Sequence, residues 1–461
     1  MLSIRPLPRR KRALWGAALV ALLGNGPVAA PVQMNLAQAD ALAAQALAVR
    51  QPSLAYDLSK GLLQADPKNP RAHYYQAMAL AQAKAYGPAE RKAALAYWHS
   101  NTEEQRFESA NLAAQLAFAD ARLTGSQFWL RRAVDHAPDE VARARTVSAF
   151  KNVRARNPLR FDLRFSATPS DNVNNGASSP LNVIDGVPVV GTLSPSAQAL
   201  SGVITTVKAA LSYRLAQGEG RETRLRARVN TRRIKITDSV PGLSGSDLSS
   251  TTAELGVSQY LRGGRETVTW KFDVDGGRVW YGGDPLYDFA RLGVQRYQRL
   301  GKRVLLSFGV NAEEQQDEAN RGADATVLGG FAALGLDLSG GGRLGFQLQY
   351  RDTDSNGINR SSQQWTGVAS YQMGRAIGPA RMEFSLGAST LDFNHYSVGF
   401  ITVPGGRKDE SIFGGVTATF EDWGYMGFVP TVSVTTEKSD SNISRFDVAE
   451  TSLTLGIRSE F

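Results

Sequence analysis

The stretch RETRLRARVNTRRIK, Arg221–Lys235, decides the fold of this chain. It carries seven arginine or lysine side chains in fifteen residues, a density that is typical of a nucleic-acid-binding patch. Its arginines, however, alternate with Leu225, Ala227 and Val229. Because successive side chains of a β-strand point to opposite faces, this period of two predicts a strand with one basic face and one apolar face. We therefore expect no nucleic-acid partner.

The same alternation returns in later segments. Apolar side chains recur at every second position of Arg303–Glu314, Arg343–Asp352 and Arg381–Ser389, and the final segment Thr451–Phe461 alternates up to a terminal phenylalanine. These segments are nine residues or longer, whereas the strands of soluble sandwiches usually span about five to six residues. Long strands with one apolar face are what a membrane-embedded barrel requires.

The turns between these segments indicate how many strands there are. Six short turns alternate along residues 158–461 with seven mostly longer polar connections, among them Gly282–Pro285, which predicts fourteen strands. Short turns at one end and longer loops at the other are typical of bacterial outer-membrane barrels, and only a closed barrel pairs every backbone group in lipid. We predict a 14-stranded antiparallel outer-membrane β-barrel over residues 158–461, with Arg221–Lys235 as its third strand.

The N-terminus has the organisation of an export signal. Five arginine or lysine side chains lie between Arg5 and Arg12, an apolar stretch runs from Ala13 to Leu23, and small residues follow at Gly26–Ala30. The apolar stretch is half the length, about 20 residues, that a membrane-spanning helix needs, which argues against the alternative of a membrane anchor. We predict a signal peptide over residues 1–30 and a Gram-negative cell envelope as the destination.

Residues 31–157 have a helical pattern, with apolar side chains at spacings of three and four. The segment Asp66–Pro70 resembles a boundary between tetratricopeptide repeats, and about three helix pairs fit; an irregular helical bundle is the alternative. Since this region precedes the first strand, it shares the short-turn side of the barrel, which is the periplasm. A tetratricopeptide-like array presents a groove, so we expect this domain to dock a substrate or a periplasmic chaperone.

Composition excludes several classes of function. The chain has no cysteine, which excludes disulfides, thiolate metal sites and cysteine nucleophiles. Its four histidines show no metal-ligand spacing, and no nucleotide-binding or hydrolase motif stands in the required structural context. We expect no enzyme, no cofactor and no metal. The net charge of +9 favours an anionic partner such as anionic lipid, lipopolysaccharide or an acidic polymer.

Four arginines of the opening stretch form the candidate substrate-binding site: Arg224, Arg226, Arg228 and Arg232. They are predicted to face the barrel lumen, since a basic side chain on the lipid-facing side at mid-membrane costs about 2–4 kcal/mol. Neighbouring strands supply further charged side chains: Lys271, Asp273, Asp275 and Arg291. Two interpretations stay open, a network of ion pairs that supports the barrel and a basic track that binds an anionic or extended substrate.

A short helical array before a 14-stranded barrel resembles the surface lipoprotein assembly modulators, the Slam proteins. The local resemblance lies in RFDLRFSATPSDNVNNGAS, Arg160–Ser178, which is similar to the family's first strand with Asn-x-Asn after a proline; the matching residues are Pro169, Asn172 and Asn174. The resemblance implies an outer-membrane translocon that helps to deliver surface lipoproteins or related secreted proteins across the outer membrane. It also implies that the helical domain receives the substrate or its chaperone.

Two other functions stay open. Exopolysaccharide exporters also join tetratricopeptide repeats to a barrel, usually with many more repeats, and a passive porin with a helical plug would need no partner-binding array. The remaining expected partners are outer-membrane lipid and lipopolysaccharide around the barrel. The barrel assembly machinery is expected to recognise the terminal Phe461.

Overall fold

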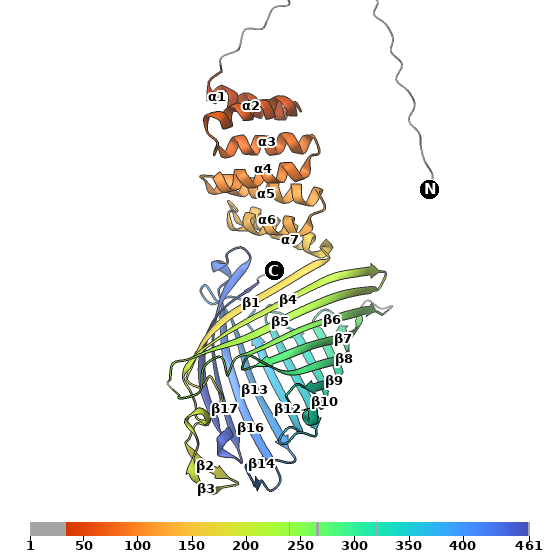
Figure 1. Cartoon of the computed structure of the whole chain (residues 1–461). Helices are drawn as coiled ribbons and strands as arrows, with labels where there is room; N and C mark the ends of the chain where they lie inside the picture. The colour runs from red at the N-terminus through yellow and green to blue at the C-terminus, as the bar shows by residue number, and fades with distance from the viewer. Residues whose placement is uncertain (1–33, 239, 264–266, 320, 460–461) are drawn as a thin grey trace, which may run out of the picture.

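The computed structural model describes residues 34–238, 240–263, 267–319 and 321–459. The predicted signal peptide, residues 1–30, and the terminal Phe461 lie outside the described residues. Along the described chain a stack of helices is followed by a large barrel (Figure 1). None of the described helices is long and apolar enough to cross a membrane.

Seven helices form the N-terminal part of the described chain, and each packs mainly on its neighbours in sequence. The odd-numbered helices begin after a side chain that accepts a hydrogen bond from the backbone N–H three residues further on, which caps the helix; these side chains are Asn35, Asn69, Thr102 and Asp139. Buried alanines let the helices pack closely, and contacts of α3 with α1 and α5 make the stack continuous. The helices are α1 (Leu36–Ala48), α2 (Pro52–Ala65), α3 (Pro70–Gln82), α4 (Tyr86–His99), α5 (Glu103–Ala119), α6 (Leu123–Asp135) and α7 (Glu140–Arg156).

Fourteen antiparallel strands form the barrel, which closes by pairing of its first strand with its last. The barrel strands span between 11 and 17 residues, enough to cross a membrane at a tilt. The predicted fold class, a helical array followed by a 14-stranded antiparallel barrel, is confirmed, and the opening stretch forms the third barrel strand. The barrel strands are β1 (Leu159–Ser170), β4 (Gly202–Gly218), β5 (Arg221–Ile236), β6 (Ser250–Arg262), β7 (Val268–Tyr281), β8 (Asp284–Leu300), β9 (Val304–Asp317), β10 (Ala325–Asp337), β11 (Arg343–Ser355), β12 (Ser362–Gln372), β13 (Arg381–Phe393), β16 (Arg407–Thr419), β17 (Phe428–Ser441) and β18 (Val448–Ser459).

The connections follow the predicted division into short turns and longer loops, with one exception. The link between β7 and β8 was expected to be a longer loop, but it is a two-residue turn formed by Gly282 and Gly283. Both residues have a positive φ, +65° and +98°, which glycine adopts without a steric penalty. The prediction for Gly282–Pro285 was therefore wrong.

The outer and inner faces of the barrel differ in polarity. On the outer face, Leu292, Val310 and Leu386 are each more than 60% exposed. The positions between such residues carry charged, hydroxyl or amide side chains that face the interior. An exposed apolar band around a closed barrel is stable in contact with lipid, which makes this a transmembrane barrel of the outer-membrane type.

Two small hairpins lie in the loops at the end of the barrel that is remote from the helices (Figure 1). They are β2 (Leu181–Ile184) with β3 (Val187–Thr192), and β14 (Ser397–Val398) with β15 (Ile401–Thr402). Ile184, Val403 and Ile443, from three different loops, pack together with at most 6% exposure. This apolar cluster fastens the loops to one another on the β1–β18–β17 side.

The helical stack is joined to the barrel by a short connection. Only Asn157 and Pro158 separate α7 from β1. Asn157 is 3% exposed, and its side chain donates to Thr124 Oγ1 at 3.1 Å and accepts from the backbone N–H of Leu159 at 3.0 Å. The side chain thus ties the start of β1 to the start of α6.

Two further contacts fix the last helices on the barrel rim. The guanidinium of Arg214, on β4, donates to the backbone carbonyls of Ala155 and Arg156 at 3.2 and 2.6 Å. On the other side of the junction, the backbone N–H of Met426 donates to Asp135 Oδ2 at 2.7 Å. Because the contacts come from β4 and from the β16–β17 turn, they hold the helical stack from two sides.

Candidate functional site

The four arginines of the candidate site lie on β5. Arg224, Arg226, Arg228 and Arg232 occupy alternate positions on its inner face, whereas Leu225 between them is 44% exposed on the outer face. The strand therefore has the predicted basic inner face and apolar outer face. The partners of these arginines decide what the inner face can bind.

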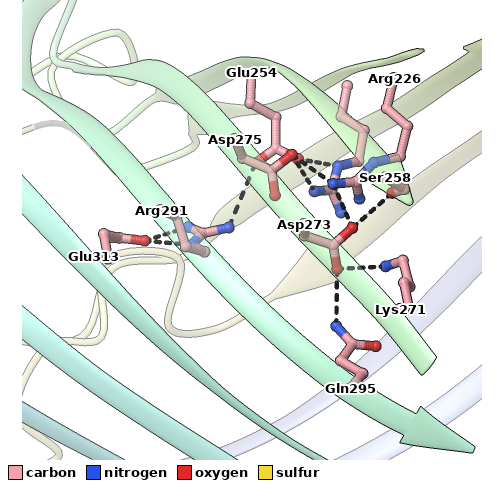
Figure 2. A network of polar contacts seen from close by, with 10 residues as sticks. Arg226, Glu254, Ser258, Lys271, Asp273, Asp275, Arg291, Gln295 and Glu313 are labelled. Atoms are coloured by element: carbon pink, nitrogen blue, oxygen red, sulfur yellow. Dashed lines mark hydrogen bonds and ion pairs between the residues drawn. The ribbon is translucent and has the colours of Figure 1, made fainter. Parts of the chain in front are cut away.

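Arg226 is the centre of a buried ion-pair network on the inner wall (Figure 2). Its Nη2 atom lies 2.8 Å from Asp273 Oδ1 and 2.7 Å from Asp275 Oδ1, and these two side chains are only 6% and 5% exposed. Lys271 Nζ lies 2.8 Å from Asp273 Oδ2, and Ser258 Oγ donates to Asp273 Oδ1 at 2.6 Å. Buried carboxylates are thus matched by cations and a hydroxyl, as the low polarity of the site requires.

The strand register arranges the network as a row around the wall. Arg226 pairs with Gly256, Gly256 with Asp275, Asp275 with Arg291, and Arg291 with Glu313 across β5 to β9. Arg291 also forms an ion pair with Glu313, a side chain that is 4% exposed. Positive and negative side chains therefore alternate along the hydrogen-bonding direction, which places opposite charges side by side.

Arg228 extends the network toward the loop end of β5. Its guanidinium forms an ion pair with Glu254, and its Nη2 atom lies 3.6 Å from Asp275 Oδ1. Glu254 Oε2 in turn lies 3.7 Å from Arg291 Nη1. The positive charges in the middle of the arginine series are thus matched by carboxylates of the neighbouring strands.

Gly256 is a site residue that sequence reasoning did not identify. A Cβ atom at this position would lie 1.9 Å from Asp275 Oδ1 and 2.6 Å from the backbone oxygen of Val274. The missing side chain leaves the space through which Arg226 reaches Asp275 across β6. The signal in the sequence was a glycine inside an otherwise regular strand pattern, which often marks a close approach of another group.

The two ends of the arginine series have other partners. Arg224 is 4% exposed and forms an ion pair with Glu222, while its buried Nη2 atom has no hydrogen-bond partner among the described residues. Arg232 Nη2 donates to the backbone carbonyl of Val173 at 2.9 Å, in the loop after β1. The pairing of Arg224 with Glu222 is of the kind that the ion-pair interpretation expects, whereas Arg232 contacts a backbone carbonyl. Substrate binding by the four arginines stays a prediction.

The opposite inner wall, from β12 through β18, is rich in hydroxyl side chains. Thr417 and Ser433 hydrogen-bond at 2.9 Å, and Thr435 and Ser452 at 2.8 Å, each pair joining neighbouring strands. The lumen is therefore asymmetric, with matched charges on β5–β9 and hydroxyl pairs on β16–β18.

The residues of the Asn-x-Asn stretch shape the loop after β1. Pro169 lies on β1 opposite Val203. Asn172, 1% exposed, accepts from the backbone N–H of Gly176 at 2.6 Å and donates to the carbonyl of the same residue at 2.9 Å. Asn174 accepts from the N–H of Leu200 at 3.0 Å. In this structure the two asparagines thus satisfy the backbone of their own loop.

Two titratable side chains in the helical part are perturbed by burial. Burial lowers the pKa of His73, whose Nε2 atom lies 3.0 Å from the carbonyl oxygen of Pro67. Burial raises the pKa of Asp135, at the contact with the β16–β17 turn. Within the described ranges, no group of three or more histidine, aspartate or glutamate side chains is arranged to hold a metal ion.

Comparisons with known proteins gave matches among solved structures only. The sequence matches no protein-family model and no curated protein. Among solved structures, the chain is similar to the outer membrane channel DcaP of Acinetobacter baumannii, with 12% identity, a TM-score of 0.38, and coverage of 66% of this chain and 97% of that one. It is also similar to a BenF-like porin from Pseudomonas fluorescens Pf-5, with 8% identity, a TM-score of 0.34, and coverage of 65% and 98%. Likenesses this weak carry no argument about function.

Proposed function

We propose that the protein is an outer-membrane conduit that helps to deliver surface lipoproteins or related secreted proteins, with the helical stack on the periplasmic side, as the resemblance to the Slam proteins implies. The observation that carries this proposal is the fixed position of the helical stack at the barrel rim. The connection of Asn157 and Pro158 is too short to let the stack move away independently. A substrate that binds the helices is therefore held beside the opening of the barrel.

An exposed aromatic surface on the helices supports a role in docking. Trp98 on α4 and Phe128 on α6 are 60% and 45% exposed, although aromatic side chains are usually buried. The guanidinium of Arg132 lies 3.5 Å from the centre of the Phe128 ring and 5.5 Å from that of Trp98. Aromatic and arginine side chains dominate the binding energy of protein interfaces, so we assign this surface to the protein substrate.

The asymmetric lumen suits a passage. On β5–β9 most charges are already matched, and β16–β18 carry hydroxyl side chains that pair with one another. Such walls offer a passing polypeptide many weak contacts in place of a few strong ones, which favours release. Conduction requires binding that is strong enough for admission and weak enough for exit.

The barrel's lipid environment provides a further proposed partner. Arg233 and Lys235 are exposed on the outer face of β5, at the end remote from the helices. We assign these two side chains to phosphate groups of lipopolysaccharide in the outer leaflet, since a cation on the outer face is favourable near such a surface. Recognition of Phe461 by the barrel assembly machinery stays a prediction.

The proposal is tested in cells that lack the gene. Protease-accessible lipoproteins on intact cells should be lost, and the full chain should restore them. A chain that lacks residues 36–156 but still inserts its barrel should not restore them, because it cannot hold the substrate at the rim. Surface levels of the barrel are measured in parallel as the control.

Two outcomes would decide against the proposal. An unchanged surface proteome with loss of an exported polysaccharide would assign the protein to polysaccharide export. An unchanged surface proteome, together with large single-channel conductance of the barrel without residues 36–156, would assign it to passive diffusion.

A further inference from the structure

Two recesses open at the barrel rim below the helical stack. The junction recess, about 260 Å³, lies between α6, α7 and the start of β1. The rim recess, about 250 Å³, lies beside the β4–β5 turn and the end of β6. Arg160, an inward-facing residue of β1, lines both recesses, so they form one continuous surface from the helices into the barrel.

The continuous surface is strongly basic. Three arginines line the junction recess and four line the rim recess; because Arg160 is shared, the described lining residues include six different arginines and one carboxylate, Glu222. The six are Arg131, Arg154, Arg160, Arg221, Arg224 and Arg262. On the β5–β9 wall of the lumen, by contrast, the arginines are matched by carboxylates, so the excess of arginine is found at the rim.

The single carboxylate does not neutralise the surface. Glu222 forms its ion pair with Arg224, whose buried Nη2 atom is still without a hydrogen-bond partner among the described residues. Within the described chain, the side chains of Arg154, Arg160 and Arg262 form no ion pair with a carboxylate. Several guanidinium groups are thus left to bind an anionic ligand.

Like charges also lie close together on the helical side of the surface, where Arg131 and Arg154 are neighbours. The pKa of Arg131 is lowered, first by burial and then by the nearby Arg154. A carboxylate placed beside Arg154 and Arg160 would accept directed hydrogen bonds from their guanidiniums. Each recess, of about 250–260 Å³, has room for the carboxylate-bearing side chain of an acidic residue.

We propose that this arginine surface is the site at which an acidic segment of the protein substrate enters the barrel. The inference rests on the proposed function, because it names the chemistry of the segment that the conduit receives. An extended acidic peptide can place successive carboxylates in the junction recess and in the rim recess, on the route from the helices to the lumen. The four arginines predicted from the sequence contribute only Arg224 to this surface.

Binding is measured by fluorescence anisotropy with the purified full chain in detergent. The probes are a short labelled peptide rich in glutamate and aspartate, and the same peptide with glutamine and asparagine in their place. The acidic peptide should bind at least about tenfold more tightly, and its affinity should fall as salt rises from about 0.05 M to 0.5 M, because salt screens exposed charges.

A triple variant, Arg154→Gln, Arg160→Gln and Arg262→Gln, should weaken acidic-peptide binding by about tenfold or more. The matched control removes the same number of charges from the exposed end of β8 and the β8–β9 turn, with Arg299→Gln, Lys302→Gln and Arg303→Gln, and should bind like the parent. Mobility of the folded barrel in unheated gels confirms that both variants fold. Arg160→Lys, which keeps the charge, should retain part of the affinity.

Equal affinity for the acidic and the amide peptide, or equal affinity of the triple variant and its control, would overturn the inference. Preference for an oligogalacturonate over the acidic peptide would also overturn it and would assign the surface to an anionic polysaccharide. Neither binding result alone contradicts the proposed function as an outer-membrane conduit. The cell-surface experiment decides that proposal separately, because it does not depend on the charge of the substrate.

Discussion

Replacing Arg226 by methionine is expected to destabilise the barrel by about 3 kcal/mol. The substitution keeps an unbranched side chain of similar length but removes the cation that lies 2.8 Å from Asp273 and 2.7 Å from Asp275. Both carboxylates are at most 6% exposed, so water cannot replace the lost partner without rearrangement. An uncompensated buried charge is the main cause of the expected loss.

The magnitude follows from the partners that remain. Removing one member of a buried ion pair commonly costs about 3–5 kcal/mol. Asp273 would keep Lys271 Nζ at 2.8 Å, and Asp275 would keep Arg228 Nη2 at 3.6 Å. The remaining cations compensate part of the charge, which places the expected value at the lower end of the range.

The free energy of unfolding is measured in detergent along a urea series, with the folded fraction read from the mobility of the unheated barrel in gels. Arg233→Met is the matched control, since Arg233 is an exposed outward residue of the same strand and should change stability by less than about 0.5 kcal/mol. The double variant Arg226→Met and Asp275→Asn should recover most of the loss, because Asp273 keeps Lys271, Arg228 keeps Glu254 and no buried carboxylate is left in excess. A single variant as stable as its control, or a double variant no more stable than the single one, would refute the ion-pair account.

Single contacts elsewhere set three further expectations. Gly256→Ala should cost about 1–3 kcal/mol in the same urea series, because its Cβ would lie 1.9 Å from Asp275 Oδ1; an unchanged midpoint would contradict this. Asn172→Ala should leave the buried N–H and carbonyl of Gly176 unpaired at a local cost of about 1–3 kcal/mol, and protease should cleave the β1–β4 loop faster. Equal cleavage rates of variant and parent would count against this role of Asn172. Because burial lowers the pKa of His73 from its ordinary value of 6.5, the unfolded chain takes up a proton first as the pH falls. The helical stack should therefore keep its full stability above this ordinary value and lose stability as the pH falls toward the lowered pKa. His73→Gln should flatten the dependence in urea unfolding followed by helical ellipticity, and an equally steep dependence in the variant would rule out His73 as its source.

The sequence was sufficient to predict the helices and strands and their order, because the helical spacing of three and four and the strand alternation of two are both local patterns. Alternation of apolar and polar residues identifies a barrel strand without knowledge of its neighbours, as for Arg221–Lys235 and β5. The turn at Gly282 and Gly283 was missed because a Gly-Gly-Asp-Pro segment is equally compatible with a loop and with a tight turn from sequence alone. Only the pairing of Tyr281 with Asp284 distinguishes the two.

The partners of the arginines were beyond sequence reasoning because they depend on register. Asp273 and Asp275 were recognised as charges on a neighbouring strand, but a shift of one residue would have turned them toward lipid. The observed register places Gly256 between Arg226 and Asp275, and the contact passes over a strand that has no side chain there. The junction recess was equally hidden, since it brings Arg131 and Arg160 together from different parts of the chain.

Matched and unmatched charges are unequally distributed between the barrel rim and the lumen wall, and this distribution gives the arginines different roles in the proposed conduit. In the middle of β5, Arg226 and Arg228 are held by carboxylates and have little attraction left for a passing anion. At the rim, Arg154 and Arg160 line a surface whose described residues include one carboxylate, Glu222, so an acidic segment would be attracted there first. A uniformly basic lumen would retain the same segment along its whole length. The rim would attract an acidic segment strongly, whereas the matched charges on β5–β9 would attract it weakly. This difference favours capture of the segment at the rim without its retention in the lumen. Passage would then run in one direction when the segment folds or binds a partner outside the cell.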